Sequence, residues 1–281
     1  MTTTSALLAT YPLHEGAGTP VLLLHGFPLD HRMWAAAAQA LPEGVRAIGV
    51  DLPGQGHSDL GGIPPRLEDV ADAVHRTMRA QGEGNAVVVG LSMGGYVALA
   101  LAERHPGFVV GLGLVDTKST ADLDAARANR LRIADLVTEG QTLDPVLSMP
   151  GALLGTTSAE QRRNLFPLLE SWIRAQSPSG VAWAQRAMAA RPDRTPVLET
   201  FDGPVAVVVG AEDQVTPLVE AEHMVHAARD GALTVVPAAG HMSAVEDPAT
   251  VAAAIGLLHR RVAERTNPPR WPWQYRPAST R

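Results

Sequence analysis

The residue in this 281-residue chain best suited to chemistry is Ser92, within the pentapeptide G-L-S-M-G at residues 90–94. This G-x-S-x-G pattern follows the apolar run 86–89 and precedes a helix-like stretch at 96–104. Strand, sharp turn and helix in that order form a nucleophile elbow, which needs small residues because the serine backbone is strained. The turn also puts the hydroxyl at a helix N-terminus, where developing negative charge is favoured. We therefore predict a nucleophile rather than an idle serine in a tight turn.

A serine hydroxyl needs a general base, and that base needs a carboxylate to orient it. His241 comes just after the apolar run 233–236, and Asp213 just after the run 205–209. The chain order serine, aspartate, histidine is the one used by hydrolases that carry a nucleophile elbow. We predict His241 as the general base and Asp213 as its orienting acid.

Two other carboxylates compete with Asp213. Asp116 ends the apolar run 109–115, and that strand end should face the same site. Glu212 directly precedes Asp213 and is the weaker rival.

The oxyanion of a tetrahedral intermediate needs two backbone N–H donors. We expect one from Met93, the residue after the nucleophile, and the other from Phe27 in the loop H-G-F-P at residues 25–28. Pro28 has no N–H to offer. His25 is expected to hydrogen-bond and hold this loop, without a part in proton transfer.

These loops require a sheet whose strand ends meet at one edge. Short, often β-branched apolar runs, typical of strands covered on both faces, occur at residues 21–24, 47–50, 86–89, 109–115, 205–209 and 233–236. Helical spacing separates several of them, as in Leu67, Val70, Val74 and Met78. The same spacing recurs over residues 251–262, after Asp247-Pro248, a plausible N-cap followed by proline at the first helical position. The pattern predicts an α/β fold with a mostly parallel sheet, helices on both faces and ligands at the carboxyl ends of the strands.

The alternation stops over residues 119–199, which have the pattern of helices without a strong strand. We expect a helical cap there, inserted into a core of residues 1–118 and 200–266. Trp172, Trp183 and Met188 either line an acyl pocket or simply pack the cap.

Residues 267–281 form a Pro/Trp-rich C-terminal extension. Trp271, Trp273 and Tyr275 would share one side of an extended segment, so we predict that they dock on the same chain or on a second subunit. A disordered terminus is the alternative.

Composition excludes several functions. The 23 Lys and Arg against 29 Asp and Glu give a net charge of −6, which argues against nucleic acid. A single lysine, Lys118, leaves little room for Schiff-base chemistry, and the absence of cysteine removes thiolate catalysis and Cys-ligated metals. His223 and His226 share a helical face but lack a third ligand, so we expect no metal and no cofactor. Without a visible secretory signal or an apolar run long enough to span a membrane, cytoplasmic location is the expectation.

Five motifs in order resemble the α/β-hydrolase superfamily: H-G-F-P-L-D at residues 25–30, D-L-P-G-Q-G-H-S at 51–58, G-L-S-M-G-G at 90–95, G-A-E-D at 210–213 and G-H at 240–241. They are most similar to the branch of 3-oxoadipate enol-lactonases, small carboxylesterases and cofactor-free haloperoxidases (perhydrolases). The resemblance covers about residues 20–118 and 200–262. It implies hydrolysis of a small carboxylic ester or lactone through an acyl-enzyme. Ser92 excludes the dehalogenases and epoxide hydrolases of this fold, whose nucleophile is an aspartate.

Three alternatives stay open. A perhydrolase uses the same site with peroxide in place of water, and carbon–carbon bond hydrolases share the triad. A small-molecule receptor can also keep an intact triad. The chain is expected to meet a small-molecule substrate and no membrane, and a homo-oligomer is possible.

Overall fold

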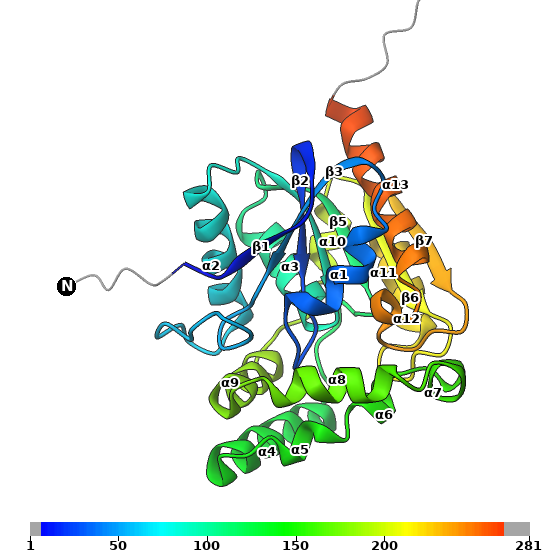
Figure 1. The fold of residues 1–281 in the computed structure, drawn as a ribbon. Helices are drawn as coiled ribbons and strands as arrows, with labels where there is room; N and C mark the ends of the chain where they lie inside the picture. Colours follow the sequence, from blue (N-terminus) through cyan, green and yellow to red (C-terminus); the bar gives the residue numbers. More distant parts are fainter. Residues whose placement is uncertain (1–6, 267–281) are drawn as a thin grey trace, which may run out of the picture.

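The computed structural model describes residues 7–266, and its centre is a seven-stranded sheet (Figure 1). Residues 1–6 and 267–281 lie outside the described residues, and so does the predicted docking of the C-terminal extension. The strands follow the spatial order β1-β3-β2-β4-β5-β6-β7. Their bounds are β1 Thr10–His14, β2 Gly16–Leu24, β3 Gly44–Val50, β4 Ala86–Leu91, β5 Val109–Val115, β6 Val205–Gly210 and β7 Gly231–Val236.

The sheet is parallel except at its β1 edge. Each neighbouring pair from β3 to β7 is parallel, whereas β1 runs antiparallel to β3, with Thr10 opposite Val50. The predicted α/β fold with a mostly parallel sheet is confirmed, and each predicted apolar run lies inside a strand. The strand β1 was not predicted, because its sequence T-Y-P-L-H contains no continuous apolar run.

Helices cover both faces of this sheet (Figure 1). The helices α2 and α3 pack together on one side, and α1 and α13 pack together on the other. Asp247 caps α13 as predicted, because its carboxylate accepts the Thr250 N–H over 3.1 Å. The bounds are η1 His31–Trp34, α1 Ala35–Gln39, α2 Leu67–Ala80, α3 Met93–Arg104, α11 Leu218–Ala227, α12 Ser243–Glu246 and α13 Pro248–Thr266. None of the described helices combines the length and apolar character that crossing a membrane requires.

Between β5 and β6 the regular secondary structure consists of helices alone. Its helices are α4 Asp124–Gly140, α5 Asp144–Leu147, α6 Pro150–Leu153, α7 Thr156–Gln161, α8 Leu165–Arg174, α9 Pro178–Ala189 and α10 Thr195–Thr200. In Figure 1 the green helices α4 to α9 gather beside one end of the sheet. In contrast, α10 packs against α3 and α11. The division into core and cap at residues 118/119 and 199/200 stays a prediction.

Candidate active site

Ser92 lies in the sharp turn between β4 and α3. Its φ of 51° and ψ of −113° are a strained conformation for a residue with a side chain. The turn is also crowded: a Cβ on Gly90 would lie 2.1 Å from the carbonyl carbon of Gly94, and a Cβ on Gly94 would lie 2.1 Å from the carbonyl oxygen of Leu24. Glycine is therefore required on both sides of Ser92, as a nucleophile elbow demands.

His241 touches both other members of the predicted triad. Its Nε2 lies 2.9 Å from Ser92 Oγ, and its Nδ1 lies 2.8 Å from Asp213 Oδ2. His241 and Asp213 are each 3% exposed. Because an ionised carboxylate only accepts hydrogen bonds, Nδ1 must carry the proton. Nε2 of the neutral ring is then free to accept the Ser92 hydroxyl proton.

Asp213 lies in surroundings that favour its ionised form. Its Oδ1 accepts the N–H groups of Val215 and Thr216 over 2.7 and 3.0 Å, and the Thr216 hydroxyl donates to Oδ2 over 2.8 Å. Burial alone would raise the pKa of Asp213, but the hydrogen bonds from His241 and Thr216 outweigh it and hold the pKa below its ordinary value. Asp213 can therefore orient the imidazole as an anion.

Asp116, the stronger rival, is fully buried but points elsewhere. Its Oδ1 accepts the Gly210 N–H and its Oδ2 accepts the Ser243 N–H, each over 2.9 Å. Burial is the main reason why its pKa is raised to about 7. Within residues 7–266 no hydrogen bond joins it to His241.

Glu212, the weaker rival, turns toward the inserted helices. Its carboxylate accepts the N–H of Thr157 over 2.8 Å and the hydroxyl of Thr157 over 2.5 Å. Of the candidate acids, only Asp213 is brought to His241.

The loop that carries Phe27 runs beside the elbow. A Cβ on Gly26 would lie 3.6 Å from Ser92 Cβ. The backbone N–H groups of Phe27 and Met93 donate to no acceptor among the described residues. Their role as oxyanion donors stays a prediction.

His25 fixes this loop through both ring nitrogens. Its Nε2 accepts the N–H of Leu52 over 2.9 Å, which leaves Nδ1 to donate to the carbonyl oxygen of Gly26 over 2.9 Å. Burial lowers the pKa of His25, which favours the neutral ring that this pattern requires.

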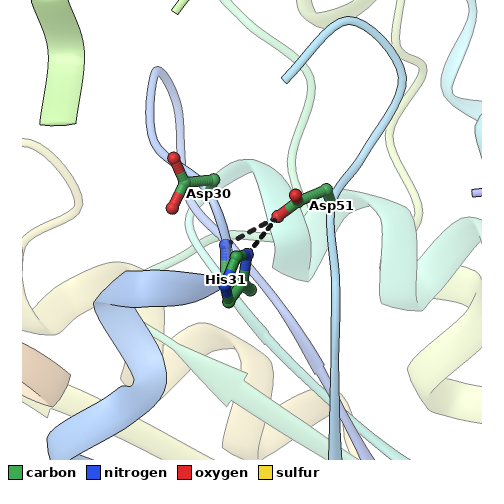
Figure 2. Close-up of side chains that lie close together, drawn as sticks. All are labelled: Asp30, His31 and Asp51. Atoms are coloured by element: carbon green, nitrogen blue, oxygen red, sulfur yellow. Dashed lines mark hydrogen bonds and ion pairs between the residues drawn. The ribbon is translucent and has the colours of Figure 1, made fainter. Parts of the chain in front are cut away.

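A second polar cluster lies outside the triad, where Asp30, His31 and Asp51 come close together (Figure 2). Their possible ligand atoms lie within 4.8 Å of one another, as in a metal site. Asp51 Oδ1, however, already accepts from the backbone N–H and Nδ1 of His31, over 2.9 and 2.8 Å. Asp30 accepts hydrogen bonds from Nε and Nη2 of Arg32 over 2.8 and 2.7 Å, so the Arg32 guanidinium group already pairs with this carboxylate. The donor set therefore fits a structural cluster better than a metal centre.

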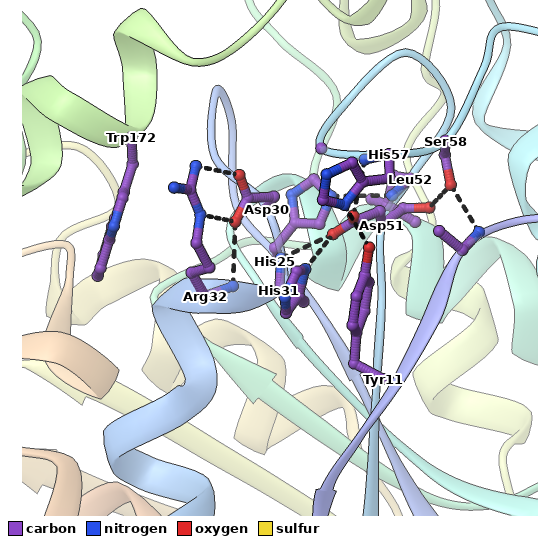
Figure 3. Close-up of polar contacts among 12 residues, drawn as sticks. Tyr11, His25, Asp30, His31, Arg32, Asp51, Leu52, His57, Ser58 and Trp172 are labelled. Carbon is purple, nitrogen blue, oxygen red and sulfur yellow. Dashed lines mark hydrogen bonds and ion pairs between the residues drawn. The ribbon is translucent and has the colours of Figure 1, made fainter.

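The same cluster extends into the loop after β3 (Figure 3). The Ser58 hydroxyl donates to the Asp51 carbonyl oxygen over 2.6 Å, and the ring of Tyr11 stacks on His31 with 3.4 Å between the centroids. The Tyr11 hydroxyl lies 2.6 Å from His57 Nδ1. Hydrogen bonds to His31 and His57 outweigh burial and lower the pKa of Asp51 to about 2. This network tethers the loops after β2 and β3 to each other, and thereby supports the Phe27 loop.

The predicted pocket residues make contacts of different kinds. Trp183 donates its indole N–H to the Ile63 carbonyl oxygen over 2.8 Å, which ties α9 to the loop before α2. Met188 is 2% exposed, and its sulfur accepts a hydrogen bond from Arg130 over 3.3 Å. Trp172 is partly buried on α8 (Figure 3). Their role in an acyl pocket stays a prediction.

His223 and His226 lie on α11, where His223 Nε2 is 3.1 Å from the Thr195 hydroxyl. Neither belongs to the one group of potential metal ligands found among the described residues.

Known proteins share this architecture and parts of the sequence. The chain is 30% identical over 246 residues to a pimeloyl-[acyl-carrier protein] methyl ester esterase of Aromatoleum aromaticum, covering 84% of this chain and 96% of that protein. The solved structure of a thermophilic esterase from Thermogutta terrifontis, with malate bound, matches with a TM-score of 0.84 at 35% identity, covering 91% of this chain and 93% of that one. The enol-lactonase from Burkholderia xenovorans LB400 matches in fold, with a TM-score of 0.79 at 22% identity over 90% of this chain and 96% of that one.

The predicted superfamily is thus confirmed by sequence as well as by fold. The family described as "alpha/beta hydrolase fold" matches residues 19–248, which include Ser92 in its elbow, Asp213 and His241. The chain therefore belongs to the α/β-hydrolase fold family.

Proposed function

We propose that this α/β-hydrolase is a serine hydrolase that cleaves a small carboxylic ester or lactone through an acyl-enzyme. The observation that carries the proposal is the pair of contacts from His241, at 2.9 Å to Ser92 and 2.8 Å to Asp213. These contacts supply an activated nucleophile without any additional group. Relatives named as esterases, at 30% and 35% identity, further support an ester as the substrate.

In the first half-reaction, Ser92 Oγ forms a bond to the acyl carbon while its proton passes to His241 Nε2. The carbonyl oxygen becomes an oxyanion, which accepts hydrogen bonds from the backbone N–H groups of Phe27 and Met93. Collapse of this intermediate breaks the bond to the leaving oxygen, which takes the proton from His241. An alcohol departs, or stays tethered in the case of a lactone, and the acyl group remains on Ser92.

In the second half-reaction, His241 removes a proton from water, and the hydroxide oxygen attacks the acyl carbon. Collapse returns the proton to Ser92 Oγ and releases the carboxylic acid. Asp213 stays ionised throughout and stabilises the imidazolium in each step.

The test is a labelling and turnover experiment. A fluorophosphonate should label Ser92, located by mass spectrometry of the digested protein, and Ser92→Ala should lower p-nitrophenyl ester turnover by roughly 10³-fold or more. Labelling at another serine, or near-normal turnover of Ser92→Ala, would contradict the proposal.

A substrate panel separates the alternatives that use the same triad. Esters and lactones test hydrolysis, peroxide with a carboxylic acid tests perhydrolysis, and a vinylogous diketone tests carbon–carbon cleavage. A single burst of product followed by almost no turnover would favour a receptor. We retain the cytoplasmic location, the small-molecule ester or lactone partner and a possible homo-oligomer as predictions from the sequence.

A further inference from the structure

The loop that carries His241 is fastened at consecutive backbone N–H groups. Gly240 and Met242, on either side of the histidine, both donate to Oε1 of Glu246, over 2.9 and 3.1 Å. The N–H of His241 itself donates to the carbonyl oxygen of Leu153 at the end of α6, over 2.8 Å. The backbone of the histidine loop is therefore held by one carboxylate oxygen of Glu246 and by the carbonyl oxygen of Leu153 in the inserted helices.

The other oxygen of Glu246 binds the same inserted segment. Oε2 accepts the Gly155 N–H over 2.9 Å and the hydroxyl of Ser158. Glu246 is 4% exposed, and Ser158 is fully buried. Every one of these partners is a donor, so both carboxylate oxygens of Glu246 act as acceptors. Without this side chain, several buried N–H groups would lose their acceptor, which is costly in a low-dielectric interior.

The two segments also meet backbone to backbone. A Cβ on Gly155 would lie 2.7 Å from the Gly240 nitrogen, and a Cβ on Gly240 would lie 2.3 Å from the Gly155 nitrogen. Glu212, the neighbour of Asp213, holds the same segment through Thr157. Residues 155–157 of the inserted helices therefore pack directly against the loops that carry Asp213 and His241.

We propose that Glu246 is a positioning residue for His241. It clamps the histidine loop to residues 153–158 and so keeps the imidazole within reach of Ser92 and Asp213 together. This inference rests on the proposed function, because it takes His241 as the general base. The geometry is demanding, since a displacement of about 1 Å in a catalytic group can cost about 100-fold in rate.

Two substitutions and one matched control test the clamp. Glu246→Ala removes both carboxylate oxygens that accept these hydrogen bonds. Glu246→Gln keeps an oxygen for Gly240 and Met242 but turns an NH₂ group toward the Gly155 N–H. Val262, a buried residue of α13, lies against the start of β5, where a Cβ on Gly111 would be 2.6 Å from Val262 Cγ2. Val262→Ala therefore loses packing and stability at the opposite end of the strands from the loops that carry the predicted triad.

With p-nitrophenyl acetate, kcat should fall about 100-fold in Glu246→Ala and about tenfold or less in Glu246→Gln, with little change in KM. KM should hold because Glu246 touches the histidine loop and not the substrate. The acid limb of the kcat/KM profile should also move to lower pH in Glu246→Ala, because a displaced imidazolium is less well stabilised by Asp213. Val262→Ala should lower the melting temperature without moving that limb.

Fluorophosphonate labelling of the wild type keeps the two hypotheses apart. No labelling at Ser92 would refute the proposed function itself. If Ser92 is labelled but both Glu246 variants keep the wild-type kcat and pH profile, the clamp is refuted while the hydrolase proposal stands. The clamp is likewise refuted if Val262→Ala reproduces the loss in kcat and the moved limb. Circular dichroism checks folding, and Glu246→Gln carries the test alone if Glu246→Ala does not fold.

Discussion

Asp116→Asn distinguishes a buried structural carboxyl group from a catalytic one. Asp116 is fully buried, and its oxygens accept the N–H groups of Gly210 and Ser243. Burial raises its pKa from the ordinary 3.8 to about 7; His241 partly offsets this effect and Asp213 reinforces it. Below about pH 7 the folded protein therefore binds a proton here that the unfolded chain loses as the pH rises above 3.8.

The sign of the pH dependence follows from this raised pKa. The folded state binds the proton more tightly, so the stabilisation is complete below pH 3.8 and is lost as the pH rises through about 7. Each pH unit in that window costs roughly 1.4 kcal/mol, so the loss between about pH 5 and pH 8 is roughly 3 kcal/mol. Asparagine has no such proton to lose. Its NH₂ group faces one of the two N–H donors, which costs about 1–3 kcal/mol at every pH.

Urea denaturation of wild type and Asp116→Asn across this pH range measures the difference in their free energies of unfolding. The other titratable groups are the same in both proteins, so their contributions largely cancel in this difference. The variant should be clearly less stable than wild type at the acidic end, and the gap in free energy of unfolding should narrow by about 3 kcal/mol toward the alkaline end. A gap that stays constant with pH would refute a proton on Asp116. Turnover of the same variant should exceed that of Asp213→Asn; the reverse ranking would make Asp116 the catalytic acid.

The remaining predictions concern the triad and its surroundings. Asp213→Asn should lower kcat by about 10⁴-fold, measured on p-nitrophenyl esters, because the amide favours the wrong imidazole tautomer. Turnover should fall at low pH as His241 becomes protonated, in a profile that Ser92→Ala lacks. Dialysis against EDTA should leave turnover unchanged, whereas a loss restored by a divalent ion would reveal a metal. Gly240→Ala should lower the melting temperature and kcat together, because its Cβ would lie 2.3 Å from the Gly155 nitrogen. Deleting residues 267–281, which lie outside the described residues, should lower the melting temperature or change the mass seen by light scattering while fluorophosphonate labelling persists.

The sequence was informative where one local rule determines both structure and position. Ser92, Asp213 and His241 each follow a run of apolar residues, and parallel strands bring such run ends to one edge of the sheet. The turn around Ser92 also has a steric requirement that only glycine meets, so five residues are enough to predict the elbow. The start of α13 was predictable for a similar reason, because Asp247-Pro248 is a helix start in composition as well as in structure.

Other features depend on residues that are distant in sequence. The edge strand β1 owes its conformation to pairing with β3, and its mixed residues T-Y-P-L-H carry little pattern of their own. Chain order does not separate Asp213 from Asp116, because each follows a strand and each lies between Ser92 and His241. What distinguishes them is the 2.8 Å contact of Asp213 with His241, which residue type alone does not reveal. The contact of Glu246 with Gly155 spans 91 positions, and a glutamate five residues after a histidine gives no local sign of it.

The inserted helices make contacts in the structure that their sequence does not predict. The sequence predicts a helical cap over residues 119–199, in which Trp172 and Trp183 either line an acyl pocket or simply pack the cap. In the structure their segment 153–158 also holds the backbone of His241, through Leu153 and through Glu246. If His241 is the general base as proposed, a shift of this segment also moves that base, so a substitution there should change turnover as well as the packing of the insertion. Exchanging the whole insertion for that of another hydrolase should therefore lower kcat even for a substrate that the new pocket accepts, unless the contacts to Glu246 and to the His241 N–H are kept.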